Sequence, residues 1–343
     1  MAGPGRERIL AIDVVRGLAV VGMLLVNDAG IPTAMPLALR HAPWQGLTVA
    51  DQVFPLFLFT VGASMPFSER AQRPVAVLRR VAALVVLGSL LVSAKHHQLA
   101  PSTGVLQQIA GAYLLAWAVL RLPRRAQLPA AAVLLAGLWA AFTFVPAPRG
   151  AAGVVGAGQQ PGRVCRPQPA WPLLRARRAG HGGQQCERAG GGHRRAAATP
   201  PPRRAAAGVT RRLLAVGAGM LTLGLLVALA VPISKPLWTP SFVLVTAGVS
   251  ALLAAVAYRL VDRGPARRWA RPLLALGSNA LALYAASVLL FAFLLKPWQG
   301  ALVQPLATAG GATFAALAYA AGTVLVVWAL AEWLYWRRVF VKV

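Results

Sequence analysis

Long apolar runs, most of them closed by arginines, dominate this chain and restrict what it can fold into. About nine runs are long enough to cross a bilayer, because a transmembrane helix needs roughly 20 apolar residues. The composition agrees, since 57% of the 343 residues are hydrophobic and only 13% are charged. Soluble domains carry about twice that charged fraction. We therefore predict an all-α polytopic membrane protein with about nine transmembrane helices.

The predicted spans fall into two groups, one on each side of an irregular segment. Residues 1–145 form an N-terminal half, residues 146–211 form the irregular segment, and residues 212–343 form a C-terminal half. The expected spans are Ile9 to Val26, Thr48 to Ser68, Val75 to Ala94, Gly104 to Leu122, Leu128 to Val145, Leu213 to Val231, Ser241 to Leu260, Pro272 to Leu295 and Thr313 to Trp336. The last span ends in aromatic and cationic residues, which anchor helices at the membrane interface.

The formal net charge of +27 comes from 35 basic and 8 acidic residues. Such an excess is typical of proteins that bind nucleic acid or anionic surfaces. Here most arginines flank apolar runs or crowd the irregular segment, so nucleic acid is not an expected partner. Both cysteines, Cys165 and Cys186, lie in that segment and indicate neither a disulfide framework nor a metal site. The first apolar run lacks a small-residue cleavage site, so no cleavable signal peptide is expected.

The stretch from His41 to Gly62 contains the strongest candidates for chemistry. His41 lies in a short loop, and Asp51 lies within the apolar run that follows it. A histidine titrates near neutral pH and can carry a proton for a reacting group. An acid at bilayer depth is costly and usually faces a protein interior. The alternatives are a surface histidine and an acid that only supports packing.

A second pair of polar residues lies in the first span. Asp13 and Arg16 are three residues apart, which places them on one face of a helix. Opposite charges enter a membrane together at lower cost than either alone. A functional pair and an ion pair near the headgroups are equally compatible with this spacing.

The stretch HAPWQGLTVADQVFP resembles the first catalytic motif of the heparan-alpha-glucosaminide N-acetyltransferase family. The residues in register are His41, Trp44, Gly46, Leu47, Thr48, Asp51 and Pro55. In the first span, IDVVRGLAVVGMLLVN is similar to the family's opening pattern at Asp13, Arg16, Gly17 and Asn27. The resemblance implies that the histidine is the active-site residue of a transmembrane acetyl transfer from acetyl-CoA to an amino sugar. Asn27 precedes the His41 loop and is expected to orient the imidazole.

The resemblance continues in later spans. GVLQQIAGAY is similar to the family's second motif at Gln107 and Tyr113. GSNALALY is similar to a late motif at Asn279 and Tyr284, and KPLWTPSF, which begins at Lys235, resembles a family loop. These matches extend the resemblance over the chain, except for Arg149 to Thr210.

The resemblance implies a bacterial transmembrane acyltransferase with acetyl-CoA as co-substrate and no metal. His41, Asp51 and Asn27 are then the catalytic candidates. The candidates for binding the substrates are Asp13, Arg16, Trp44, Gln107, Tyr113 and Asn279. The acceptor is expected to be a glycan or amino sugar on the extracytoplasmic side. His41 either deprotonates the acceptor or carries the acetyl group covalently. The expected location is the bacterial cytoplasmic membrane, with both termini in the cytoplasm; a monomer and a homodimer both fit.

The segment from Arg149 to Thr210 is unlike the rest of the chain. It is rich in Arg, Gly, Pro and Gln and has no apolar periodicity, as in a disordered basic linker. We interpret it as an out-of-frame translation of GC-rich DNA. For residues 159–171 and for residues 184–195, codons can be chosen that specify the amino acids as written. Read one base downstream, both sets of codons encode sequences that resemble the family.

The distribution of arginines in the loops supports this interpretation. With the amino terminus inside, the arginines near Arg70 and at Arg121 to Arg125 face the cytoplasm. If nothing spans between Val145 and Arg212, the basic loop from Arg259 to Arg271 falls outside, against the positive-inside rule. One further membrane-spanning helix before Arg212 would return this loop to the cytoplasmic side. We therefore predict a ten-helix ancestor whose sixth helix is scrambled here.

Two other functions compete with the acyltransferase. In a transporter or flippase, Asp13, Arg16 and Asp51 would form a charge relay within the membrane. No inverted repeat, which is common in transporters, is visible in the sequence. The third hypothesis is an inactive product of a frameshifted gene.

Overall fold

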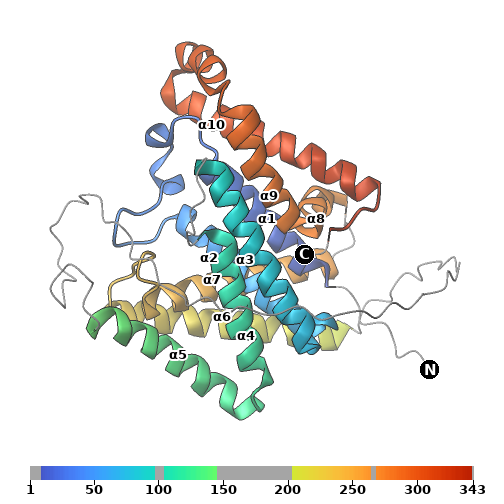
Figure 1. Cartoon of the computed structure of the whole chain (residues 1–343). Coiled ribbons are helices and arrows are strands. Elements are labelled where there is room, and N and C mark those ends of the chain that lie inside the picture. Colours follow the sequence, from blue (N-terminus) through green and yellow to red (C-terminus); the bar gives the residue numbers. More distant parts are fainter. Residues whose placement is uncertain (1–8, 97–103, 145–202, 264–267, 342–343) are drawn as a thin grey trace, which may run out of the picture.

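The computed structural model describes residues 9–96, 104–144, 203–263 and 268–341. Every regular element in these ranges is helical, which confirms the all-α class (Figure 1). The α-helices are α1 (Leu10–Asn27), α2 (Val49–Ser64), α3 (Pro74–His96), α4 (Val105–Arg121), α5 (Arg124–Phe144), α6 (Arg203–Ala228), α7 (Pro240–Ala257), α8 (Arg271–Ser278), α9 (Ala280–Leu289) and α10 (Gln299–Trp336). Single π-helical turns extend α7 to Asp262 and α9 to Leu295.

Six of these helices are long and apolar enough to cross a membrane, or seven if the bent pair α8 and α9 counts as one span. The prediction of about nine spans is therefore not confirmed. The chain bends by 69° between Arg268–Ser278 and Ala280–Leu295. Helix α4 is apolar, but with 17 residues it is too short to count among these spans. Apolar length alone does not reveal such breaks, because the same residues suit a straight span and a bent pair.

Helix α1 is the centre of the bundle and packs against α2, α7, α8, α9 and α10. Its contact with α8 is the closest, because glycines on both helices let the two backbones meet. A Cβ atom on Gly17 would collide with the carbonyl of Leu273, and one on Gly277 would collide with the carbonyl of Asp13. Small residues allow this kind of close approach in membrane bundles.

Helix α10 departs from the sequence prediction at its start. It begins at Gln299, whereas the predicted span starts at Thr313. A kink at Gly311 separates the added part from the predicted part, with a φ of 83° that a residue with a side chain rarely adopts. The added part contains Pro305 and several glycines. These residues disfavour helices, so the sequence does not indicate a helix here.

The ends of the bundle differ in charge. The N–H groups of Leu10 and Ala11, which start α1, donate to the Asp262 carboxylate at 3.0 and 2.8 Å. Helix α2 runs antiparallel to α1, since Arg16 reaches the carbonyl of Thr60 at 3.4 Å. The basic loops after α2, α4 and α7 therefore lie at the end where α1 begins, which we call the basic end. The His41 loop lies at the other end.

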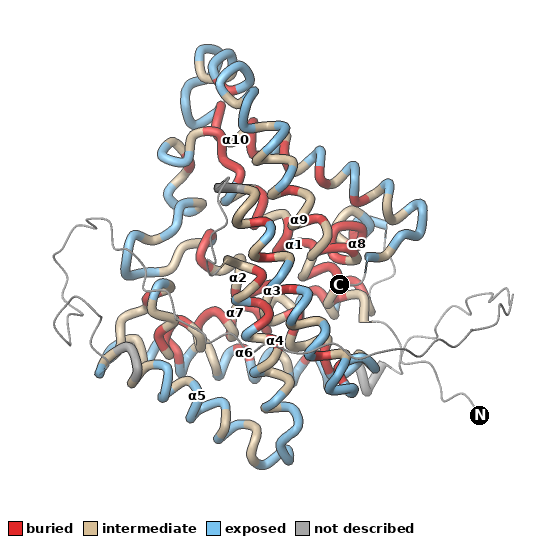
Figure 2. The backbone as a smooth tube through the Cα atoms, viewed as in Figure 1, coloured by how far each residue is buried: buried red, intermediate tan, exposed pale blue. Residues whose placement is uncertain are grey.

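Burial is concentrated around α1, α2, α7 and α8, whereas α5 is mostly exposed (Figure 2). Large apolar side chains cover the exposed faces of the outer helices. Examples are Val86 of α3, Leu128 of α5 and Leu226 of α6. Such faces suit contact with lipid, because the exposure of apolar side chains to lipid carries no free-energy cost.

The irregular segment is only partly described. Helix α6 begins at Arg203, ahead of the predicted start at Leu213, and Thr210 is buried. The Ala and Arg residues here are good helix formers, which explains the earlier start. Residues 145–202 lie outside the described residues, and so do both cysteines.

Candidate functional site

The Asp51 carboxylate lies in the first turn of α2 and is completely buried. Its Oδ2 accepts the backbone N–H of Ala42 at 3.1 Å, the N–H of Thr48 at 3.2 Å and the Thr48 hydroxyl at 2.9 Å. Thr48 is the N-cap of α2, where an acid in the first turn is favoured by the free N–H groups and the helix dipole. The sequence placed Asp51 inside a span, but local hydrogen bonding explains it as an acid at a helix end.

His41 contacts the other oxygen of this carboxylate. Its Nδ1 lies 2.8 Å from Oδ1 of Asp51. The His41 side chain is 46% exposed, whereas the Asp51 side chain is 0% exposed. The imidazole is therefore held from the buried side and is open to solvent on the other.

Lys235, from the loop between α6 and α7, completes the cluster. Its Nζ lies 3.3 Å from Oδ1 of Asp51 and 3.1 Å from Nδ1 of His41. If Lys235 donated to Nδ1, then Nδ1 would carry a lone pair and no proton. That lone pair would face the negatively charged Asp51 carboxylate, and the two would repel each other. We therefore assign the proton to Nδ1, so that His41 and Lys235 both donate to Oδ1. In this tautomer Nε2 has a free lone pair and can accept a proton.

The loop that carries Lys235 is held against the His41 loop by two further hydrogen bonds. The Ser234 hydroxyl donates to the carbonyl of Trp44 at 2.9 Å, and the N–H of Gly46 donates to the carbonyl of Ile233 at 2.9 Å. Gly46 has a φ of 110°, which favours glycine at this position. The two loops thus form one hydrogen-bonded unit above α2.

Burial lowers the pKa of Lys235 below its usual value, and the neighbouring Asp51 carboxylate partly opposes this by stabilising the charged form. The Lys235 side chain is 25% exposed. A cation so placed is costly unless it is paired, and Asp51 supplies the partner.

The structure does not place the other candidates in this cluster. Asn27 is exposed at the end of α1 and lines a cavity whose wall contains neither His41 nor Asp51. The Trp44 side chain is 47% exposed, and its backbone carbonyl provides the contact with Ser234. Asn27 is therefore not hydrogen-bonded to the imidazole as the sequence led us to expect.

Asp13 and Arg16 form the predicted pair on α1. Arg16 Nη1 lies 3.0 Å from Oδ1 of Asp13, and Nη2 donates to the carbonyl of Thr60. This pair lies near the basic end of α1, away from the His41 loop. It joins α1 to α2.

The remaining candidates make structural contacts. Gln107 accepts the N–H of Gly104 at 3.0 Å and donates to Ser89 at 3.3 Å. Tyr113 is buried, with the Arg80 guanidinium 4.6 Å from its ring centroid. The Asn279 side chain donates to the carbonyl of Val339 and accepts the N–H of Val341, which fixes the C-terminal segment.

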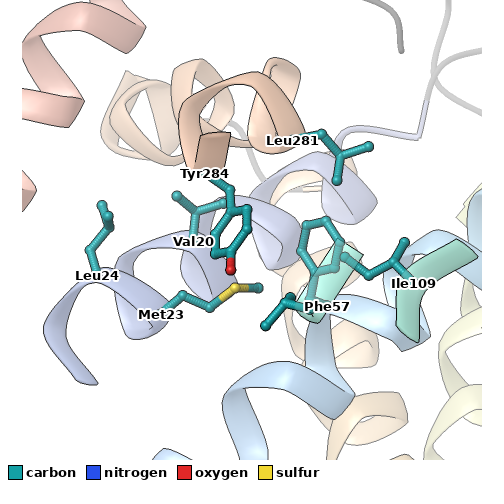
Figure 3. Close-up of a pocket in the computed structure, with 8 residues that line it drawn as sticks. Val20, Met23, Leu24, Phe57, Ile109, Leu281 and Tyr284 are labelled. Atoms are coloured by element: carbon teal, nitrogen blue, oxygen red, sulfur yellow. The ribbon is translucent and has the colours of Figure 1, made fainter. Parts of the chain in front are cut away.

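Two cavities lie between α1, α4 and α9. The first has a volume of about 10 Å³ and an apolar lining, and Figure 3 shows the Tyr284 hydroxyl pointing toward Met23. It has room for about one water molecule. The second has about 200 Å³ and is lined by Asn27, Asp28, Tyr284 and Ser287 among others. Within the described residues, no group of His, Cys, Asp and Glu side chains is arranged to hold a metal.

Lys235 is the residue of this site to which sequence analysis assigned no role. It is 194 residues from His41 in the chain, so no local pattern connects the two. The available signal was KPLWTPSF, whose resemblance to a family loop placed Lys235 among matched residues.

These features define a helical membrane protein with a His41–Asp51–Lys235 cluster at the end of the bundle opposite its basic loops. Residues 8–155 match the family model described as heparan-alpha-glucosaminide N-acetyltransferase, catalytic. This part of the chain is therefore similar to that family, which confirms the resemblance seen in its motifs. The match includes His41 and Asp51 and ends before Lys235.

Two curated proteins are similar to this chain. Heparan-alpha-glucosaminide N-acetyltransferase of Mus musculus is 38% identical over 88 residues, which are 25% of this chain and 13% of that protein. The Homo sapiens protein of the same name is 43% identical over 58 residues, which are 17% of this chain and 8% of that protein. The similarity thus spans a small share of the length of these relatives.

Proposed function

We propose that this protein is a transmembrane acyltransferase that moves an acetyl group from acetyl-CoA to an amino sugar or related glycan. The observation that carries the proposal is the hydrogen bond between His41 and Asp51, inside the part of the chain that matches the catalytic family. A histidine held by a buried carboxylate, with its second nitrogen free, is an arrangement suited to general-base catalysis. The names of the similar proteins supply the substrate class.

The chemistry follows from the assigned tautomer. Nε2 of His41 takes a proton from the acceptor amine as the amine nitrogen bonds to the acetyl carbonyl carbon. The C–S bond then breaks, and the CoA thiolate leaves with the electron pair of that bond. The imidazolium returns its proton to the thiolate, which restores neutral His41 and yields CoA and the acetylated amine. Asp51 stabilises the imidazolium and fixes its orientation.

A covalent route uses the same nitrogen. Nε2 attacks the acetyl carbonyl, the CoA thiolate leaves, and the acetyl group then passes from His41 to the acceptor. Incubation with acetyl-CoA in the absence of an acceptor distinguishes the two routes. Mass spectrometry would detect an acetyl group on His41 only if the covalent route operates.

The charge distribution supports an assignment of sides. We place the basic end of the bundle in the cytoplasm, where the positive-inside rule puts it. Both termini then lie in the cytoplasm of a bacterial cell, the anionic nucleotide of acetyl-CoA approaches the arginines, and His41 faces the extracytoplasmic side. The proposal requires no metal and no nucleic acid, and it holds for a monomer or a homodimer.

An acetyl-transfer assay tests the function. Purified protein in detergent, given acetyl-CoA and glucosamine, should release CoA thiol and form N-acetylglucosamine. His41→Ala should insert normally but lower the rate about 10² to 10⁴-fold, the usual contribution of a general base. If this variant keeps most of the activity, His41 is not the catalytic residue. If the wild-type protein transfers no acetyl group to any amino sugar tested, the proposed function is wrong.

The transporter hypothesis receives less support from the side-chain contacts. A relay requires its charged groups to exchange protons or ions with one another. Asp13 pairs with Arg16 near the basic end, while Asp51 pairs with His41 and Lys235 at the opposite end of the helices. Substrate uptake by proteoliposomes that lack acetyl-CoA would favour the transporter instead.

A further inference from the structure

Lys235 lies outside the matched part of the chain, yet it contacts both members of the His41–Asp51 pair. We propose that Lys235 is a positioning residue of this site, whose ammonium shares Asp51 with His41 and keeps the imidazole neutral, with Nε2 free. The proposal rests on the acyltransferase function for its biological meaning. Its physical content, the effect of one charge on the protonation of His41, is independent of any activity.

The first argument is electrostatic. The described titratable groups in contact with His41 are Asp51 from α2 and Lys235 from the α6–α7 loop. A fully buried carboxylate beside an imidazole favours the imidazolium, which cannot accept another proton. The Lys235 ammonium, 3.3 Å from the same carboxylate oxygen, offsets that charge. With both partners present, the surroundings of the imidazole are close to neutral.

The second argument is geometric. The loop around Lys235 is fixed by the Ser234 and Gly46 hydrogen bonds described above. Trp238 in the same loop packs edge-on between Phe54 of α2 and Phe242 of α7, with centroid distances of 5.9 and 5.7 Å. The φ of Trp238 is 49°, an uncommon value for a residue with a side chain. A loop anchored at several points holds the ammonium at a defined distance from His41.

The site is therefore built from both halves of the chain. Asp51 and His41 come from the N-terminal half, and Lys235 comes from the C-terminal half, beyond the irregular segment. The N-terminal half alone would hold a His41–Asp51 pair with an uncompensated carboxylate. We infer that the C-terminal half sets the pH range in which the pair can act as a base.

The test measures the protonation of His41 directly. Diethylpyrocarbonate reacts with neutral imidazole, so the pH dependence of labelling at His41, followed by peptide mass spectrometry, gives its titration midpoint. The variants are Lys235→Met, which removes the charge, and Lys235→Arg, which keeps it. Lys296→Met is the matched control, because Lys296 is exposed at the end of the π turn after α9 and makes no contact with His41 among those described.

The expected result is an upward shift of the midpoint in Lys235→Met by about one pH unit, from removal of a unit charge at hydrogen-bond distance. Lys235→Arg and Lys296→Met should stay within a few tenths of a unit of the wild-type protein, by the same estimate. An unchanged midpoint in Lys235→Met overturns the proposal. So does an equal shift in Lys296→Met, which would show a general charge effect.

The transfer assay adds a second measurement and separates the two proposals. In Lys235→Met the acidic limb of the pH–rate profile should move up with the labelling midpoint, and activity should recover at high pH. A merely structural role would lower the rate equally at every pH and would contradict the inference. A shifted labelling midpoint in a protein with no transfer activity would refute the proposed function but support the role of Lys235.

Discussion

At the scale of single residues, the buried Asp51 carboxylate is held by several donors at once. Its oxygens accept from His41, Lys235, Ala42 and Thr48, and Thr48 donates through both its N–H and its hydroxyl. All these partners are donors, which fits an ionised carboxylate and leaves no place for a proton on either oxygen. The same side chain thus caps α2 and fixes the His41 ring.

Substitution of Asp51 by Asn tests this double role. An amide has one oxygen, so either the two backbone N–H groups or His41 must face its NH₂ group. If the NH₂ group faces His41, Nδ1 becomes an acceptor and the proton moves to Nε2, which can then no longer act as a base. Because only one of the two amide orientations disables the base, we expect Asp51→Asn to lower the rate of acetyl transfer about 10²-fold, at the lower end of the loss expected for His41→Ala.

Asp262 provides the matched control for that variant. It also accepts the N–H groups of a helix N-terminus, those of Leu10 and Ala11, but it lies at the basic end of the bundle. Asp262→Asn should cost about 1 kcal/mol of stability, as for other caps, and leave transfer nearly unchanged. Equal losses of activity in both variants would mean that Asp51 acts through stability alone.

At the scale of secondary structure, the contact between α1 and α8 is the tightest constraint. Gly277 of α8 lies against the carbonyl of Asp13, and its position leaves no space for a methyl group. Ala favours helices over Gly by about 1 kcal/mol, but overpacking costs about 1 to 3 kcal/mol. We therefore expect Gly277→Ala to lower the thermal unfolding temperature in detergent.

Gly111 of α4 is the comparison for Gly277. A Cβ atom at Gly111 meets nothing within 4 Å, so Gly111→Ala should be neutral or stabilising through helix propensity alone. The two variants make the same chemical change in opposite environments. If both shift the unfolding temperature in the same direction, the α1–α8 contact is looser than described.

The sequence predicted the helices better than their breaks. Apolar runs located α1, α2, α3 and α7 closely, because apolar length alone decides which segments can cross a membrane. The bend between α8 and α9 was missed because packing produces it, and the helical start of α10 was missed because Pro305 and glycines disfavour a helix there. For the site, the motif gave His41 and Asp51, which are ten residues apart. Lys235 required tertiary structure, because loop packing brings it to Asp51.

At the scale of the whole molecule, the directions of α5 and α6 are informative. Helix α5 starts just after Arg121, which donates to the carbonyl of Gln72 at 2.7 Å at the basic end. Helix α6 also starts at the basic end, because it packs along α7 with Gly217 near Leu252 and Gly224 near Val245. In Figure 1 the last part of α5 lies on the same side as the end of α6. Helices α5 and α6 therefore run in the same direction, although α5 is not among the helices that are long and apolar enough to cross a membrane.

This shared direction agrees with the prediction from the loop charges, which call for a further crossing before Arg212. The exposed face of α6 carries Val216, Leu223 and Leu226, a surface that a neighbouring helix or lipid can cover. The large exposed side chains on this face are apolar. Even so, the segment as translated lacks the apolar content of a membrane helix.

The last prediction follows from this mismatch. Restoring the downstream reading frame across residues 149–210 should supply an apolar helix that crosses between α5 and α6 and covers their exposed faces. The added apolar burial should raise the thermal unfolding temperature in detergent by about 5 °C or more, given that each kcal/mol corresponds to roughly 2 to 4 °C at this size. Acetyl transfer should rise with the fraction of folded protein, because Lys235 reaches Asp51 only when both halves pack together.

A third chain, with residues 149–202 replaced by a Gly/Ser linker of equal length so that α6 is kept, serves as the control. It removes the arginines of the segment without supplying a helix, so it should remain as unstable as the chain as written. If the linker chain matches the restored chain, the gain comes from removing the basic segment and not from a sixth helix. If the chain as written equals the restored chain in stability and activity, the frameshift hypothesis is wrong and residues 149–210 are a native part of the protein.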